Sequence, residues 1–169
     1  HLSLRRQRQM CIRDRDDGGI LIGTNVGGVA RFDPRTGRFV RLRPTTGQIG
    51  GRISSFAPDG AGGAFIASDE GVHHYRRFDD RIDPMAGTAI PLMDNGRRQG
   101  AFAVHRDPDG TLWAGCEQGL WALRPGGRRF ERVYVNRAHP VGDVWSILRD
   151  RKGRLWVGTG SNGVYVSTA

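Results

Sequence analysis

One short phrase occurs four times in this chain of 169 residues, and its spacing limits the folds that the chain can adopt. Each copy starts at a glycine, continues into an apolar run and ends on a small residue. The copies are residues 18–24, 62–68, 110–116 and 153–159, so successive copies lie 44, 48 and 43 residues apart. Self-similarity at a period of about 40 to 50 residues indicates a repeat architecture, in which each repeat is one supersecondary unit.

The last and third repeats show what that unit is. Val144–Leu148 is a β-branched and aromatic run, Leu155–Thr159 is a second one, and turn residues follow both. A third run begins at Val164, and the third repeat continues into a fourth strand over Phe130–Val135. Four short strands joined by tight turns predict a four-stranded antiparallel meander in each repeat.

The second strand of each meander is apolar on consecutive residues, as in Leu155–Val157. Continuous apolar character indicates that both faces are covered, as they are in a blade between two neighbouring blades of a β-propeller. Glycine follows this run in three repeats and fits a close approach of another chain segment. The predicted fold is therefore all-β, a β-propeller fragment of about three and a half four-stranded antiparallel blades. The expected blade-core positions are Leu21, Phe65, Trp113 and Trp156.

The predicted blades lie near residues 16–45, 52–95, 101–136 and 143–169, the last of them incomplete. Because the fourth repeat is clipped, we expect the chain to be a piece of a longer propeller. No strand is assigned to the irregular stretch from Asp79 to Gly100. Residues 1–15 are expected to be a non-native or linker lead-in, since Gln9–Asp14 is similar to translated adaptor sequence.

The net charge is +9, and 25 of the 26 basic residues are arginine. A balance this basic raises the possibility of a nucleic-acid partner. The arginines are spread along the chain without any nucleic-acid-binding motif, which favours arginine usage of a high-GC genome and no nucleic-acid partner. The two cysteines, Cys11 and Cys116, have no metal-binding spacing, and we expect Cys116 to be a small buried residue.

The phrase Asp150-Arg-Lys-Gly-Arg-Leu-Trp-Val-Gly-Thr159 resembles the two-component regulator propeller repeat. The turn Asp33–Gly37 resembles its second half, and Asp107–Gly115 resembles its first half. The second repeat departs most, with Phe65 for tryptophan and Ala67 for glycine. The resemblance covers about residues 16–169.

The resemblance implies an extracytoplasmic, ligand-sensing segment of a bacterial membrane-anchored receptor, in the periplasmic part of an inner-membrane protein. It implies binding without chemistry, with a histidine kinase or diguanylate cyclase as the output module elsewhere in the receptor. The implied partners are an unknown small molecule or oligosaccharide, the remaining blades of the same chain, and a second copy in a homodimer of the full receptor. Alternatives are a secreted propeller enzyme acting on glycans and a protein-interaction scaffold.

The residues themselves predict no catalytic group, no metal site and no cofactor. His73 and His74 are neighbours in a strand, so they point to opposite faces and cannot chelate one metal ion side by side. A binding site is expected where turns between second and third strands, and linkers between blades, meet at one mouth of the central channel. The candidate ligand-binding residues are Asn25, Asp69, Glu70, Glu117, Gln118, Asn136, His139 and Asn162.

Overall fold

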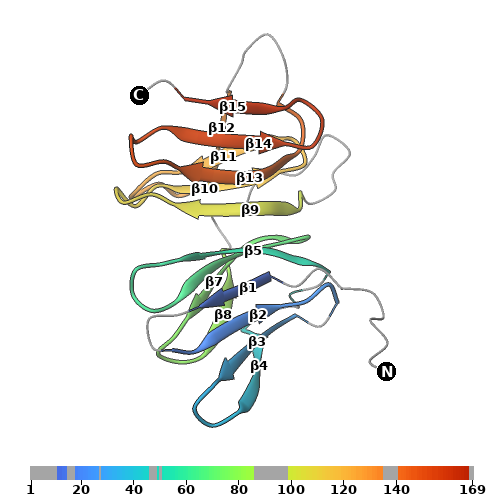
Figure 1. Cartoon of the computed structure of the whole chain (residues 1–169), viewed down its shortest axis with the longest axis vertical. Coiled ribbons are helices and arrows are strands. Elements are labelled where there is room, and N and C mark those ends of the chain that lie inside the picture. The colour runs from blue at the N-terminus through green and yellow to red at the C-terminus, as the bar shows by residue number, and fades with distance from the viewer. Residues whose placement is uncertain are drawn as a thin grey trace.

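The structure is a computed structural model that describes residues 11–14, 18–26, 28–45, 49, 51–85, 99–134 and 141–167. The described residues form strands in four successive groups and no helix that could span a membrane (Figure 1). The first group is β1 (Cys11–Asp14), β2 (Ile20–Gly23), β3 (Val29–Asp33) and β4 (Arg38–Pro44), and the second is β5 (Ile53–Pro58), β6 (Ala64–Ser68), β7 (Gly71–Arg76) and β8 (Arg81–Pro84). The third is β9 (Ala101–Arg106), β10 (Leu112–Cys116), β11 (Gly119–Leu123) and β12 (Glu131–Val133), and the fourth is β13 (Val144–Arg149), β14 (Leu155–Thr159) and β15 (Val164–Val166).

Each group is an antiparallel meander in chain order, which confirms the predicted blades of a β-propeller. The innermost strands of consecutive blades follow one another, and β5 faces β9 where the second blade meets the third (Figure 1). One pairing was not predicted. The outer strands β4 and β8 pair in parallel through Arg43↔Arg81 and Pro44↔Ile82, which joins the first two blades at their outer edge.

Two boundaries differ from the sequence-based expectation. Strand β1 lies inside the expected lead-in 1–15 and pairs with β2, so the first blade begins earlier than residue 16. The physical reason is that strand pairing uses backbone groups, and an unpaired inner edge of β2 would leave its N–H and C=O groups without partners. Strand β8 also falls within the irregular stretch 79–100, of which residues 86–98 lie outside the described part.

Three hydrophobic cores lie between consecutive blades. The core between the first and second blades is centred on Leu21, Ile66 and Tyr75, and the core between the second and third contains Ala67, Ala114 and Cys116. The core between the third and fourth contains Leu120, Val144, Leu155 and Val157. Ile66 and Ala67 are adjacent in β6 yet enter different cores, so both faces of the second blade are covered, as continuous apolar strands require.

The four expected core positions differ in burial. Leu21 is fully buried, whereas Phe65 and Trp113 are partly buried and pack against the core that their blade shares with the following one. Trp156 lies on the face of β14 that points away from the third blade and is only partly buried. Its strand neighbours on this face are the exposed Leu148 and Val166. Only the opposite face of β14, which carries Leu155 and Val157, is covered by a core.

The glycine after the apolar run marks a close approach between blades, as predicted. A Cβ atom built on Gly115 would lie 2.6 Å from Val144 Cγ1 and 2.7 Å from the Val144 carbonyl oxygen. Val144 begins the innermost strand of the next blade. Any larger residue at position 115 would push the third and fourth blades apart, so glycine here sets the distance between them.

An aspartate and a tryptophan six residues later stabilise the turn between the first two strands. Trp113 Nε1 donates to Asp107 Oδ2 at 2.6 Å, and Trp156 Nε1 donates to Asp150 Oδ2 at 2.9 Å. The second blade has Phe65 at the tryptophan position. There the His74 ring stacks on Phe65, with centroids 4.7 Å apart, and its Nε2 lies 2.9 Å from Asp59 Oδ2. His74 therefore replaces the missing indole N–H.

This substitution gives a stability prediction. Replacing His74 by leucine is expected to destabilise the protein by about 1 to 2 kcal/mol, because Asp59 loses a side-chain donor. The double variant Phe65→Trp, His74→Leu should recover most of that loss, because it restores the turn chemistry of the third and fourth blades. Urea unfolding measures both. A double variant no more stable than His74→Leu alone would contradict the equivalence of the two arrangements.

Candidate functional site

Turns and linkers meet at one end of the innermost strands, called here the mouth. The Ile53 N–H donates to the Thr24 carbonyl at 3.1 Å, which ties the first blade's turn to the linker entering the second. The Asp69 N–H donates to the Arg52 carbonyl at 3.1 Å, and the Gly160 N–H donates to the Asp143 carbonyl at 3.0 Å. In these blades the turn between second and third strands is therefore held against a linker between blades, so both kinds of loop share one face.

The predicted polar residues have different roles at this mouth. Asp69 accepts the Arg52 N–H at 2.8 Å, and Asn162 Nδ2 donates to the Val141 carbonyl at 3.2 Å. Both side chains therefore hold linkers in place. Glu70 is exposed, Glu117 and Gln118 are half-buried, and Asn25 is half-buried with its Oδ1 enclosed and without a hydrogen-bond partner in the described structure. Asn136 and His139 lie outside the described residues.

A β-bulge interrupts the innermost strands of the second, third and fourth blades close to this mouth. The pairing register shifts between Ile53 and Ser55 in β5, between Ala101 and Ala103 in β9, and between Val144 and Ser146 in β13. The extra residues are Ser54, Phe102 and Trp145. A bulge re-aims the side chain of its extra residue, and bulges are over-represented next to functional sites. The same structural position in three successive blades thus holds a hydroxyl, a phenyl ring and an indole.

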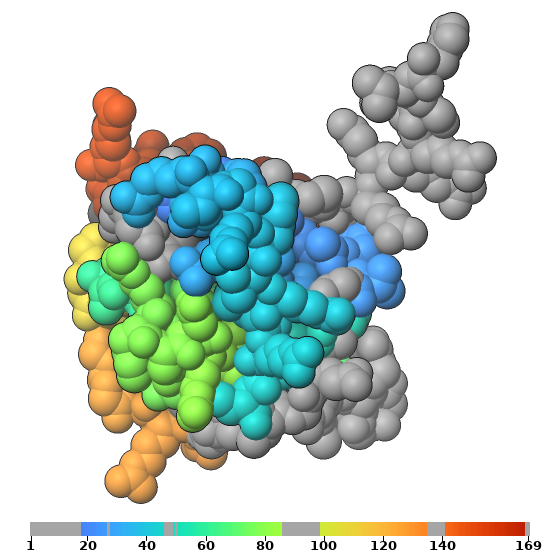
Figure 2. Space-filling view, turned by 90° about the horizontal axis from the view of Figure 1, so that it is seen from below, coloured from blue at the N-terminus to red at the C-terminus, as the bar shows by residue number. Residues whose placement is uncertain are grey.

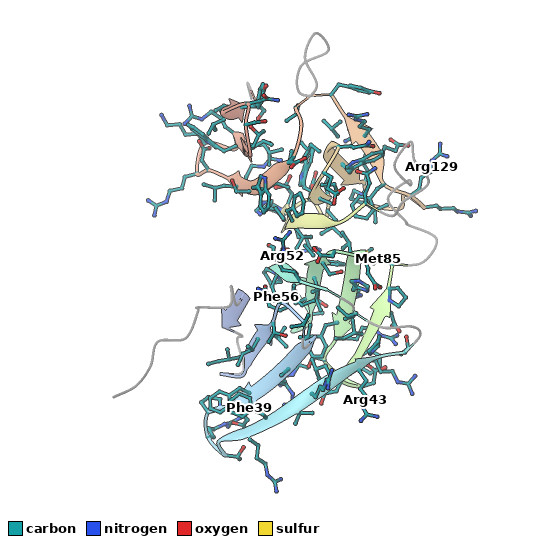
Figure 3. All side chains as sticks on the ribbon, turned by 90° about the vertical axis from the view of Figure 1, so that its right-hand side faces the viewer. Phe39, Arg43, Arg52, Phe56, Met85 and Arg129 are labelled. Atoms are coloured by element: carbon teal, nitrogen blue, oxygen red, sulfur yellow. The ribbon has the colours of Figure 1, made fainter. Side chains whose placement is uncertain are left out.

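These residues form one cluster, called here the mouth cluster: Arg52, Ser54, Phe102 and Trp145. The Phe102 and Trp145 rings are stacked, with centroids 4.3 Å apart and planes within 5°. The Arg52 guanidinium carbon lies 5.3 Å and 5.4 Å from the two ring centroids, within cation–π range. Arg52 lies where the second blade meets β9 (Figure 3). The cluster therefore joins three blades.

Two further contacts fix the orientation of the mouth cluster. Arg52 Nε donates to Ser54 Oγ at 3.2 Å, and Arg52 Nη2 lies 3.5 Å from Asp69 Oδ1. A Cβ atom on Gly160 would lie 2.7 Å from Trp145 Nε1, so glycine in the neighbouring turn makes room for the indole. Phe102, covered by Trp145, is 8% exposed, and Trp145, which lies in the last blade of this chain, is 46% exposed.

The remaining candidates for chemistry have structural partners. His73 is buried with its Nε2 2.9 Å from Ser68 Oγ, while His74 lies on the other face, as the strand geometry predicts. Cys116 is fully buried, as expected, and burial raises the pKa of its thiol. Among the described residues, no group of three His, Cys, Asp or Glu side chains is placed to hold a metal ion.

A groove lies at the outer edge of the first two blades, away from the mouth. It is open, has a volume of about 480 Å³ and runs along β4 and the start of β8, where Asp80 and Arg81 meet Leu42 and Pro44. Figure 2 shows the blue-to-cyan residues of the first blade beside the green residues of the second on this side of the molecule. Asp80 is engaged there by Arg31 Nη2 at 2.8 Å and by the Tyr75 hydroxyl at 2.7 Å. The groove thus covers a contact between two blades.

Sequence reasoning expected turns and linkers to share one face, as they do, but it did not select the residues of the mouth cluster. It selected polar turn tips, and two of the described ones, Asp69 and Asn162, use their side chains to hold linkers. The signal for the cluster was present in the aligned repeats. Phe102 and Trp145 are each the second residue of an innermost strand, directly after a small or β-branched residue that begins the strand. The bulge that they share could not be predicted from the sequence alone, because a bulge is defined by how two strands pair.

Repeated blades with cores between them define a β-propeller segment, and its repeat type is recognisable. Residues 139–161 match the family model described as two component regulator propeller, which confirms the resemblance found in the last repeat. A comparison with curated protein sequences finds no match.

Solved structures share the fold. The extracellular domain of BT4673 from B. thetaiotaomicron, described in one solved structure as part of a one-component system and in another as part of a hybrid two-component system, superposes with a TM-score of 0.74 at 20% identity, over 94% of this chain and 21% of that one. The corresponding domain of BT3049 gives 0.68 at 19% identity, over 91% and 19%. The gluconolactonase XC5397 from Xanthomonas campestris gives 0.62 at 12% identity, over 98% and 60%. The chain thus spans about a fifth of these two extracellular domains.

Proposed function

We propose that this chain is the ligand-sensing propeller segment of a bacterial membrane-anchored signalling receptor, located outside the cytoplasm and acting by binding alone. The repeat type and the fold shared with the extracellular domains of two-component systems support the sensing role. The ligand is a small molecule or oligosaccharide bound at the channel mouth. The observation that carries this proposal is the mouth cluster, in which side chains of three blades meet where the turns and linkers gather.

The mouth cluster also supports a sensing mechanism. A ligand changes a receptor only by as much as it prefers one state over another. Trp145 contacts Phe102 of the third blade and Arg52 of the second. The binding energy of a ligand that contacts Trp145 would therefore depend on how three blades are packed. Binding at this position can thereby favour one arrangement of the blades, and the receptor's output module would respond to that arrangement.

The binding role is tested on the purified chain with a library of small molecules and oligosaccharides. Ligand binding is expected to raise the melting temperature, because it stabilises the folded state by RT ln(1 + [L]/Kd). Isothermal titration then measures Kd for each compound that stabilises the chain. A folded chain that is stabilised by no compound in a broad library would contradict a ligand-sensing role.

The location is tested in the source bacterium with an antibody against this chain. Protease added to spheroplasts is expected to degrade the antigen, because the proposed segment lies outside the inner membrane. The same protease should leave a cytoplasmic marker intact in these cells. An antigen that survives until the spheroplasts are lysed would contradict the extracytoplasmic location.

A further inference from the structure

We infer that the groove at the outer edge of the first two blades binds a partner protein through an extended acidic segment, which adds as a further strand to the free edge of β4. This surface is separate from the mouth, so the inference does not depend on a ligand there. Three observations carry it: a strand edge that no described strand covers, arginines without acidic partners, and the alternation of side chains along the strand.

Strand β8 covers only the last part of β4. The two strands pair in parallel at Arg43↔Arg81 and Pro44↔Ile82, and β8 begins at Arg81. Residues 38–42 of β4 therefore have β3 on one side and no described strand on the other. The groove runs along this part of β4, and consecutive residues of the strand line it. Since successive side chains point to opposite faces of a strand, a groove lined by consecutive residues follows the backbone edge.

This free edge exposes backbone hydrogen-bonding groups. Directly after β4, the Thr45 N–H donates to the Ile82 carbonyl at 2.9 Å. Alternate residues of a strand direct their backbone groups to the same edge, so Phe39 and Arg41 direct their N–H and C=O groups to this edge as well. No described strand supplies partners for them there. An exposed edge of this kind is a template for an added strand, whose main-chain hydrogen bonds provide affinity.

A further blade would not fill the groove. Val40 pairs with Arg31, and Arg31 donates to Asp80 of the second blade at 2.8 Å, so this side of β4 faces the second blade. The opposite face of the first blade carries Phe32 and Phe39, and a blade preceding the first would pack there. Both walls of the groove belong to blades that this chain contains, so a propeller with more blades would leave the groove open.

The carboxylates near the groove already have arginine partners within the protein. Asp80 lines the groove and accepts from Arg31 Nη2 at 2.8 Å. Arg76 Nη2 lies 3.3 Å from Asp79 Oδ2 and 2.7 Å from Asp83 Oδ2. These pairs balance the negative charge on this side of the two blades, so it is not available to the other arginines of the groove.

Three exposed arginines line the groove, namely Arg41, Arg43 and Arg81. Arg41 and Arg43 have no ion pair in the described structure, and Arg81 Nε lies 3.8 Å from Asp79 Oδ2. Arg43 lies where β4 meets β8 (Figure 3), directly opposite Arg81 in the pairing. Like charges directly opposite each other destabilise a sheet. A carboxylate placed beside this pair would remove the repulsion, which favours an acidic partner.

Strand β4 also specifies the sequence pattern of that partner. Val40 and Leu42 lie on one face of the strand, and Arg41 and Arg43 lie on the other. Paired residues of neighbouring strands share a face, so an added strand places apolar side chains beside Val40 and carboxylates beside the arginines. The matching segment therefore alternates acidic and β-branched residues. A second copy of β4 does not match, because its own arginines would lie beside Arg41 and Arg43.

The test uses the whole chain and a fluorescein-labelled peptide that contains Glu-Val-Glu-Val-Glu, with fluorescence anisotropy as the readout. The peptide is expected to bind, and its Kd should rise with salt because exposed charges are screened. Peptides containing Glu-Glu-Glu-Val-Val and Lys-Val-Lys-Val-Lys are the controls, and each should bind at least about tenfold more weakly. Equal binding of the reordered acidic peptide would overturn the inference, since it would show attraction of acidic chains without strand pairing.

Backbone pairing is tested with two N-methylated forms of the alternating peptide. Methylation of the alternate amides that face β4 removes their donors and should weaken binding at least about tenfold. Methylation of the other amides, which face solvent, should leave Kd nearly unchanged. Hydrogen exchange over residues 38–42 is expected to slow when the unmethylated peptide binds. The same Kd for both methylated forms would contradict addition of a strand to β4.

The arginines are tested by the double variant Arg41→Gln, Arg43→Gln, which is expected to weaken binding about tenfold. Lysine at both positions should keep most of the affinity, because it keeps the charge. Arg128→Gln is the matched control, since this exposed arginine lies between β11 and β12 of the third blade and should leave Kd unchanged.

Circular dichroism and urea unfolding establish that each variant is folded. A folded glutamine variant with wild-type Kd would overturn the assignment of the groove. Failure of the alternating peptide to bind the folded wild-type chain would overturn the inference as a whole. Neither result would affect the proposed sensing role, because that role is tested with ligands of the mouth.

Discussion

Replacing Asp107 by alanine is expected to lower the free energy of unfolding by about 3 kcal/mol. The carboxylate is 4% exposed and joins the third and fourth blades. It accepts from Arg149 Nε at 3.0 Å, from Arg149 Nη2, and from Trp113 Nε1 at 2.6 Å. The variant leaves these donors without their acceptor. The expected loss is at the lower end of values for broken buried pairs, because the Arg149 side chain keeps 27% exposure to water.

The measurement is urea unfolding, with Asp109→Ala as control. Asp109 lies in the same turn but is exposed, and it accepts only from Thr111 of its own turn in the described structure. Its removal is expected to cost about 1 kcal/mol or less. Equal losses in the two variants would contradict a stabilising contact between blades at Asp107, because the control lacks the bond to Arg149.

The same carboxylate makes stability depend on pH. Burial acts to raise the pKa of Asp107, but hydrogen bonds from Arg149 and Trp113 outweigh it and hold the pKa below its usual value. A carboxyl with a lowered pKa in the folded state stabilises fully above its unfolded pKa of about 3.9 and loses this contribution as pH falls through the folded value. Wild-type stability should therefore fall below about pH 4, and Asp107→Asn should flatten that fall. Identical pH profiles would contradict the assignment.

The repeat predicted the blades because its signals are local. Strand composition, turn residues and the glycine at Gly115 all lie within a few residues of the feature they specify, and the structure confirms the meander and the close approach to Val144. The parallel pairing of β4 with β8 was not predicted, because it depends on how two blades twist toward each other at their outer edge. No residue pattern within one repeat carries that information.

The candidate site shows the same contrast between features with a local sequence signal and features that depend on contacts between blades. That turns and linkers share one mouth follows from the alternation of an antiparallel meander, so this arrangement was predictable. The residues that meet there were not, since Phe102 and Trp145 are brought into contact by two bulges in different blades. The second blade gives a similar case. Phe65 reads as a departure from the repeat, and only the stacking of His74 on Phe65 and its bond to Asp59 explain how the blade tolerates it.

The second large effect is expected at Tyr75, where alanine should lower the free energy of unfolding by about 3 to 5 kcal/mol. The side chain is 0% exposed in the core between the first and second blades, and it packs with Leu21, Ile66 and Ile82. Truncation would remove a ring from a core whose backbone is fixed by two joined blades, so the space cannot close easily. Urea unfolding of Tyr75→Ala measures the loss.

The Tyr75→Phe variant separates packing from hydrogen bonding. The Tyr75 hydroxyl donates to Asp80 Oδ1 at 2.7 Å, and Arg31 of the first blade donates to Asp80 Oδ2 at 2.8 Å. Phenylalanine keeps the ring and removes only the hydroxyl, so it should cost about 1 kcal/mol, since Asp80 retains Arg31. A loss in Tyr75→Phe as large as in Tyr75→Ala would mean that the bond to Asp80, and with it the polar contact between the two blades, stabilises this interface more than the buried ring does.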